Sequence, residues 1–446
     1  MFRKLVVALA IPALAGAQNP LPTVPALQPV QIDTTFKQIS LADALRLAHE
    51  NNVQNITAGN QIRTQNNTVR STKAQLYPSL TATAGQGKSA GQRVGPNNQL
   101  IDFVPAWSYS SGLSANMTLF DGGKTFADVR AAKANVSALE ASQINTDFNV
   151  ALQVKQAYNS VLAARESESA FRAQLATAQQ QLAVSIARVN AGAANVSDSL
   201  RNVVAVGQAQ LNVLSAQNTA RTQSALLTRL VGTPYFVTAQ ATDSTTDHSL
   251  APIDSVAIMG LALSGPSVRS AEANVSAAAA QERSAKSGYF PSLSASASYG
   301  GSGTKAVYGL NSNPYPYTRA INFNASFPIF NRFQRENAIS NAQISRENAE
   351  AQVRDARLTA QQNIVTAIAS LRNAEETMRV QQTNVRASEE DLRVNQQRYA
   401  LGAGTLLDVL TSQSTLVSAR QQLINARLNY RNARAQIEAA IGRDLP

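Results

Sequence analysis

The side chains that most often carry chemistry are scarce in this chain of 446 residues. It has no cysteine, so thiol catalysis, disulfides, cysteine-bound zinc and iron–sulfur clusters are excluded. Its two histidines, His49 and His248, are isolated and leave little material for a metal site or a catalytic triad. No phosphate-binding loop of the form G-x-x-x-x-G-K-[ST] occurs either. The sequence therefore predicts a protein that is not an enzyme and holds no cofactor or metal.

Acidic residues are the remaining candidates, and two of them occupy equivalent places. Asp198 and Asp408 each lie six residues after a glycine, Gly192 or Gly402, near the start of an expected helix. A carboxylate in the first turns of a helix is stabilised by the helix dipole. The pattern therefore predicts that both acids stabilise the N-terminus of a helix. A further role would depend on which residues surround them in the folded protein.

The equivalence of these two acids belongs to an internal duplication. Landmarks in the first half of the chain return in the same order about 210 positions later, which indicates a repeated structural unit. The matched landmarks are Tyr77-Pro78-Ser79-Leu80 with Phe290-Pro291-Ser292-Leu293, Leu119-Phe120-Asp121 with Ile329-Phe330-Asn331, and Arg188, Gly192, Asp198 and Gly232 with Arg398, Gly402, Asp408 and Gly442.

The first residues predict export. Arg3 and Lys4 precede an apolar run and the small residues Ala15-Gly16-Ala17, which is the pattern of a signal peptide over 1–17. An uncleaved anchor is the alternative, but the apolar run is shorter than the ~20 residues that a membrane-spanning helix needs. Basic residues are scattered along the chain although the net charge is +11. Export and this scatter together predict that nucleic acid is not a partner.

Each copy is expected to contain a helix, two strands, a long helix, a tight turn and a second long helix. No proline or glycine interrupts the chain from Asn331 to Ala400, and apolar residues recur there every seven positions, as in supercoiled helices. A helix of ~68 residues is ~100 Å long, which indicates that a distance is spanned. The expected segments are an extended segment over 18–40; repeat 1 over 41–232, with strands at 80–90 and 107–119 and long helices at 123–190 and 196–231; a linker over 233–253; and repeat 2 over 254–446, with strands at 292–302 and 318–330 and long helices at 332–400 and 405–441.

The expected strands have one apolar and one polar face, since the two kinds of residue alternate along 293–299 and 321–327. Alternation fits any half-buried sheet, so a soluble sheet is one interpretation. The export signal, the segment lengths and the aromatic residues near the strand ends favour a sheet that faces lipid. In that interpretation the lipid-facing residues are Ile321, Phe323, Phe327 and Ile329, and the pore-facing residues are Asn322, Asn324, Ser326, Ser294 and Ser296.

Four strands per chain cannot close a barrel. An open edge in lipid leaves backbone N–H and C=O groups without partners, which costs several kcal/mol for each group. Chains are therefore expected to associate: two copies would give eight strands around a filled interior, and three would give twelve around a space wide enough for water. The many polar side chains on one face favour three copies.

Further motifs stand at fixed places in the two copies: Leu41–Ala48 (LADALRLA), the two Pro-Ser-Leu strand entries, Leu119–Gly123 (LFDGG) and Arg398–Leu410 (RYALGAGTLLDVL). Together they resemble the TolC-like outer-membrane efflux proteins of Gram-negative bacteria. The resemblance implies a mainly α fold with transmembrane β-structure, in which a homotrimer forms a 12-stranded β-barrel continued by a 12-helix α-barrel tunnel across the periplasm. It also implies a passive exit duct for an efflux pump or secretion system, working with a periplasmic adaptor and an inner-membrane transporter.

The same resemblance implies roles at the two helix turns. Plain helix termination remains the alternative for the glycines and the arginines there, and Thr411 stands where many family members carry a second acid. The implied residues are Gly192, Ala193, Gly402, Ala403 and Gly404 at periplasmic tips that dock the adaptor, Asp198 and Asp408 at a tip constriction, and Arg188, Arg398 and Tyr399 in a latch that holds the tips closed.

The alternative function is an exported coiled-coil rod or adhesin without a pore. A rod explains the heptads and the export signal, but it leaves unexplained the four alternating strands between the helices. The sequence does not select a cargo among drugs, metal ions, siderophores and proteins, because the expected wall residues offer no selective pocket.

Overall fold

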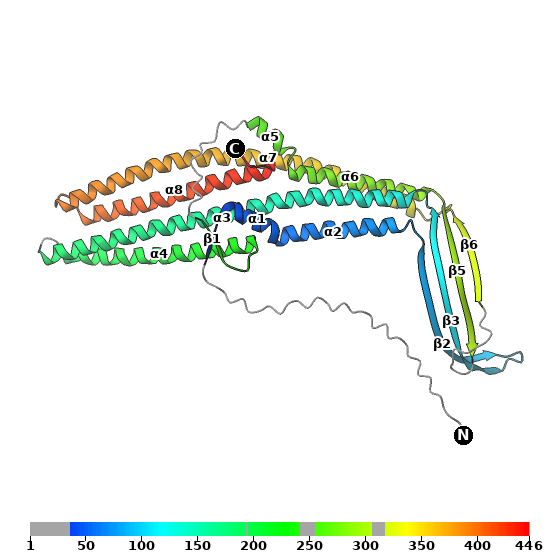
Figure 1. The fold of residues 1–446 in the computed structure, drawn as a ribbon. Helices are drawn as coiled ribbons and strands as arrows, with labels where there is room; N and C mark the ends of the chain where they lie inside the picture. The colour runs from blue at the N-terminus through cyan, green and yellow to red at the C-terminus, as the bar shows by residue number, and fades with distance from the viewer. Residues whose placement is uncertain (1–35, 193–194, 241–254, 306–316, 446) are drawn as a thin grey trace, which may run out of the picture.

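A computed structural model describes residues 36–192, 195–240, 255–305 and 317–445. The described chain is elongated, with a four-stranded sheet at one end and long helices that run from this sheet to the opposite end (Figure 1). The expected signal peptide over 1–17 and Ala193 of the expected tip lie outside the described residues. So do most of the expected extended segment over 18–40 and most of the expected linker over 233–253.

Two very long helices form the length of the molecule. α3 (Lys124–Asn190) and α7 (Gln334–Ala400) have 67 residues each, which is about 100 Å at 1.5 Å per residue. α4 (Val196–Val231) and α8 (Leu406–Ile441) return along them for 36 residues each and form two helical hairpins. The shorter helices are α1 (Leu41–Asn51), α2 (Val53–Ala74), α5 (Ser255–Ala262), α6 (Pro266–Lys286) and the 3-10 turn η1 (Ser287–Tyr289). None of the described helices combines the length and the apolar character needed to cross a membrane.

The seven-residue apolar stripes are confirmed as the packing faces of the long helices. Val154 on α3 and Ile364, its counterpart in the second copy, are both fully buried. Leu227 on α4 and Ile437 on α8 are a second equivalent pair with no exposed surface. Val154 and Leu227 lie in one hydrophobic core, built on α3 and α4, and Ile364 and Ile437 lie in the other, built on α7 and α8. The duplication of the sequence is therefore also a duplication of the packing.

One antiparallel sheet unites a hairpin from each copy. Its strands are β2 (Ser79–Val94), β3 (Leu100–Phe120), β5 (Ser292–Lys305) and β6 (Tyr317–Ser326), in the order β2-β3-β5-β6. β2 and β6 are thus the edges of the sheet. β2, β3 and β5 extend further toward the loops than the sequence pattern indicated, because backbone pairing continues where glycines and a register shift near Ser89 interrupt the side-chain alternation.

Two of the residues expected to face lipid from a strand are not in the sheet. The ladder between β5 and β6 ends at the pair Ser292 and Ser326, so Phe327 and Ile329 lie in the connection to α7. Pro328 stands between them and has no N–H to donate to a ladder, which explains why the strand stops there. The expected strand over 318–330 was therefore wrong at its end.

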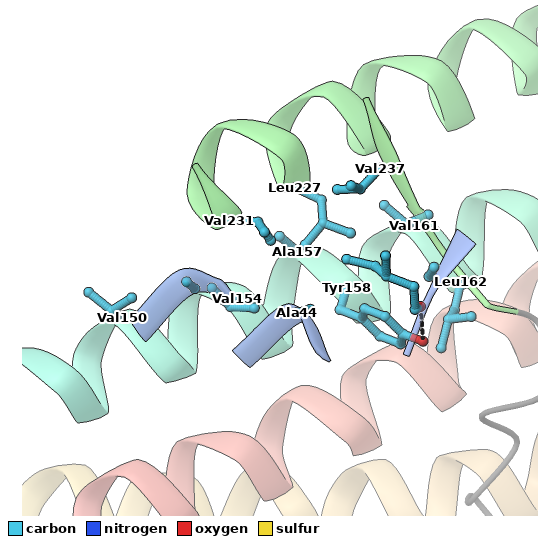
Figure 2. Close-up of a cluster of buried hydrophobic side chains, with 13 residues drawn as sticks. Ala44, Val150, Val154, Ala157, Tyr158, Val161, Leu162, Leu227, Val231 and Val237 are labelled. Atoms are coloured by element: carbon cyan, nitrogen blue, oxygen red, sulfur yellow. Dashed lines mark hydrogen bonds between the residues drawn. The ribbon is translucent and has the colours of Figure 1, made fainter. Parts of the chain in front are cut away.

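A small parallel sheet lies near the middle of the helices, and it is formed by residues that were expected to be an extended segment and a linker. β1 (Lys37–Ile39) pairs with β4 (Val237–Ala239), and β4 is buried throughout. Tyr158 on α3 donates a hydrogen bond to the carbonyl oxygen of Ile39 over 3.2 Å and lies among Val161, Leu227 and their neighbours (Figure 2). The sheet therefore fixes both ends of the first copy to α3.

Candidate functional site

The two helix turns at the end far from the sheet depend on glycines with left-handed backbone. Gly192 has φ 71° and Gly402 has φ 75°, directly after α3 and α7. The Gly402 N–H donates to the Tyr399 carbonyl over 3.1 Å and the Ala403 N–H donates to the Arg398 carbonyl over 2.9 Å, which closes the end of α7. A Cβ at either glycine would meet no atom within 4 Å, so the backbone conformation and not the space requires glycine.

Gly404 is required for a different reason. A Cβ at this position would approach the Cβ of Arg398 to 3.1 Å and the Tyr399 nitrogen to 3.3 Å. Its small size lets the loop lie directly against the last turn of α7. The second tip is therefore a compact turn, and its exposed residues, Ala403 among them, keep a defined position.

Two of the three expected latch residues meet. The Arg188 guanidinium, near the end of α3, donates a hydrogen bond from Nη1 to the Tyr399 carbonyl over 3.2 Å. Its carbon also lies 4.8 Å from the centre of the Tyr399 ring, which is cation–π distance. Arg398 instead donates to the Ala403 carbonyl of its own turn, at 3.5 Å. The contact between Arg188 and Tyr399 therefore links the hairpin of one copy to the hairpin of the other beside the tips.

The two acids of the expected constriction start the returning helices. Asp408 forms a capping box with Thr405: its Oδ2 accepts from the Thr405 N–H over 3.0 Å, and its own N–H donates to the Thr405 hydroxyl over 3.3 Å. The hydrogen bonds from the Thr405 N–H and hydroxyl, with the positive charge of Arg398, hold the pKa of the Asp408 carboxyl below its usual value. Asp198 lies half-buried in the first turn of α4. Thr405 was not among the site residues predicted from the sequence, although a threonine three residues before an acid at a helix start is a readable capping signal.

Both copies match one known protein family. The profile described as "Outer membrane efflux protein" matches residues 44–233 and 260–443, which contain both tips and most of the strands and helices. The chain belongs to the outer membrane efflux protein family. The resemblance drawn from the sequence motifs is thereby confirmed.

Individual outer-membrane proteins are similar to this chain in sequence or in fold over most of its length. The pyoverdine export outer membrane protein OpmQ of Pseudomonas aeruginosa is 28% identical over 384 residues, which cover 83% of this chain and 76% of OpmQ. Among solved structures, CusC aligns with a TM-score of 0.74 at 20% identity over 92% of this chain and 93% of its own. The outer membrane protein VceC of Vibrio cholerae aligns with a TM-score of 0.69 at 18% identity over 91% of this chain and 97% of its own. The chain is thus an outer-membrane efflux duct of a Gram-negative bacterium, with its long helices in the periplasm.

Beside the contact between Arg188 and Tyr399, this efflux protein has a hollow between its two hairpins, where packing is incomplete. This hollow of about 430 Å³ is lined by Gln181, Arg188, Asn202 and Tyr399, among others. Asn202 is only 2% exposed and its Oδ1 has no hydrogen-bond partner; Gln181 Nε2 and the Tyr399 hydroxyl are also buried without one. Buried polar groups without partners are costly, so the two hairpins separate here at a lower cost than at the apolar cores. No sequence pattern marks this hollow, because it forms only where the two copies meet.

Proposed function

We propose that three copies of this efflux protein form a 12-stranded barrel in the outer membrane, continued by a 12-helix tunnel, as the passive exit duct of a tripartite pump. The observation that carries the proposal is the two-faced sheet of four strands, which ends in the edges β2 and β6. In lipid each edge needs a strand from another chain to satisfy its N–H and C=O groups. Each copy supplies four strands and the four long helices α3, α4, α7 and α8.

The polar face of the sheet supports a wet pore. Ser296 pairs with Asn322 and Ser294 with Asn324, so the expected pore-facing residues share one face in register. From the helix-joined end as far as Gly87 and its neighbours on the other strands, the side chains on this face are serine, threonine, asparagine, alanine or glycine. A wall without fixed charge does not sort cargo by charge. Selection therefore falls to the tips and to the inner-membrane transporter.

Subunit number tests the duct directly. Native mass spectrometry of the full-length protein, exported and extracted from the outer membrane in detergent, should give three times the mass of the processed chain. Three copies are expected because they satisfy both sheet edges and leave a bore that holds water. A monomer or a dimer would contradict the proposal. A water-soluble particle that needs no detergent would instead support the alternative, an exported structural rod.

The tips are proposed to dock the periplasmic adaptor through Gly192, Ala193, Gly402, Ala403 and Gly404. Support comes from the apolar side chains beside these turns: Leu401 is 85% exposed, and Val196 and Leu200 are also exposed. Large apolar side chains gathered in solvent mark a surface that another protein covers. The compact turn at Gly404 holds the part of this surface at the second tip, around Leu401, in a fixed position.

Asp198 and Asp408 are proposed to line the constriction at the tips as rings of carboxylates. Asp408→Asn should lower the preference of the channel for cations over anions, because the amide removes one charge per subunit while its oxygen can still cap α8. The reversal potential in planar bilayers under a salt gradient measures this preference. Glu376→Gln is the matched control, since it removes an exposed acid about 36 Å before the end of α7. An unchanged reversal potential in Asp408→Asn would leave this residue with its helix role alone.

A further inference from the structure

The apolar face of the sheet has a hollow of about 500 Å³. Its floor is formed by two small residues, Ala115 and Ala297, which are register partners on the central strands β3 and β5. Leu80 on β2 pairs with Ala115, and Ile321 on β6 pairs with Ala297. This row of the sheet therefore runs large, small, small, large, and forms a trough between two leucine-sized walls.

The positively charged side chain of Arg319 lies at one end of the trough. In the adjacent row Leu113 pairs with Tyr299, and Tyr299 pairs with Arg319, which also lines the hollow. The Arg319 guanidinium lies 5.3 Å from the centre of the Tyr299 ring, which stacks on Tyr317 at 5.4 Å. No acidic side chain lies on this face among the strand residues whose side chains the structure describes. The protein therefore fixes the position of this charge with aromatic rings and leaves it available to a ligand.

The height of Arg319 fits the headgroup level of a membrane. The end of the sheet that joins the helices is periplasmic, so the opposite end, where β2 turns into β3, is the outer one (Figure 1). Arg319 lies seven residues from Ser326, the periplasmic end of β6, which is about 23 Å along the strand. The apolar band of an outer-membrane barrel is ~25 Å tall. Strand tilt lowers the residue, but its long side chain extends outward to the boundary.

We propose that this hollow is a binding site for an anionic lipid of the outer leaflet. One acyl chain lies on Ala115 and Ala297 between Leu80 and Ile321, and the lipid phosphate accepts hydrogen bonds from Arg319. An acyl chain fits because the walls are apolar, whereas a peptide in the trough would leave its backbone groups unpaired. A guanidinium presents the paired donors that a phosphate accepts. The proposal rests on the proposed function, since it needs this face to lie in lipid.

A fluorescence experiment on the full-length protein in bilayers tests the site. The chain has one tryptophan, so Trp107→Phe combined with Tyr299→Trp places the sole indole beside the hollow and keeps an aromatic ring under Arg319. Brominated phosphatidylglycerol and brominated phosphatidylcholine then compete as quenchers at equal mole fraction. The anionic lipid should bind about fivefold more strongly, as expected for one basic residue at an anionic headgroup.

Three variants in this background separate the parts of the site. Arg319→Gln should abolish the preference by removing the charge, and Ala297→Leu should abolish it by filling the trough. Lys88→Gln should retain it, because Lys88 is on the same face over Trp107 but does not line the hollow.

The remaining outcomes of this experiment contradict either the lipid site or the proposed barrel. A preference that survives in Arg319→Gln or Ala297→Leu would contradict the site, as would its loss in Lys88→Gln. Displacement of the brominated anionic lipid by millimolar inorganic phosphate would show a free-anion site instead of a lipid site. Quenching without preference for either lipid would overturn the hollow alone. Absence of quenching by both lipids would show that this face is not in the membrane, and the proposed barrel would fail with it.

Discussion

Channels that carry Arg188→Ala in every subunit should open far more readily than the wild type. The contact between Arg188 and Tyr399 joins α3 to α7 beside the tips, so an opening motion that moves one hairpin against the other must break it. One hydrogen bond and one cation–π contact contribute about 1–2 kcal/mol per subunit. In the proposed trimer the loss adds to about 3–6 kcal/mol, and the ratio of open to closed channels rises about 150-fold to 25,000-fold.

Single-channel recording in planar bilayers measures this ratio as open probability and conductance. Arg398→Ala is the matched control, because Arg398 occupies the equivalent position in the other copy. Its guanidinium donates a hydrogen bond to the Ala403 carbonyl of its own turn and not to the other hairpin. The double variant Arg188→Ala with Tyr399→Ala should open no more than the more open single variant, since both remove one interaction. Equal effects of Arg188→Ala and Arg398→Ala would show that loss of charge near the tips, and not this contact, favours opening.

The sequence indicated the long helices well because their signal is repeated many times. Val154 and Ile364 belong to stripes with a period of seven, and the shift of about 210 places both in equivalent cores. The faces of the strands were equally readable, since strict alternation assigns Ser296 and Asn322 to the polar face of their strands, and the structure pairs them there. A feature that is encoded by a pattern over many residues can thus be predicted even when a single residue departs from the pattern.

Features that rest on one contact between distant segments were not readable. The opening helix breaks at Asn52, whose Oδ1 accepts from the Gln54 N–H over 2.8 Å while its Nδ2 donates to the Leu230 carbonyl over 2.8 Å. No proline or glycine marks this break in the sequence. The pairing of β1 with β4 is similar, because each has only three residues and its partner is 200 positions away. The Arg188 contact with Tyr399 depends in the same way on how the two copies meet.

The last expected result concerns the middle of the molecule, where Tyr158 holds the small sheet against α3. Tyr158→Ala should lower the free energy of unfolding by about 4 kcal/mol, which is typical when a buried aromatic side chain is truncated and leaves a cavity. The side chain is only 1% exposed and packs against Val161 and Leu227 in the first core. The urea midpoint of the detergent-solubilised protein, followed by the circular dichroism of its helices, measures the loss.

Tyr158→Phe separates the ring from its hydroxyl. The hydroxyl donates to the carbonyl of Ile39 in β1 over 3.2 Å and accepts from the N–H of Gln240, the residue directly after β4, over 3.3 Å. Phenylalanine keeps the packing and should therefore cost only about 1 kcal/mol. Hydrogen exchange should nevertheless speed up at the amides of β1 and β4, because the strands lose their link to α3 while the core stays filled. Equal urea midpoints for Tyr158→Ala and Tyr158→Phe would contradict this prediction. They would show that the hydroxyl, and not the buried ring, stabilises the packing of β1 and β4 against α3.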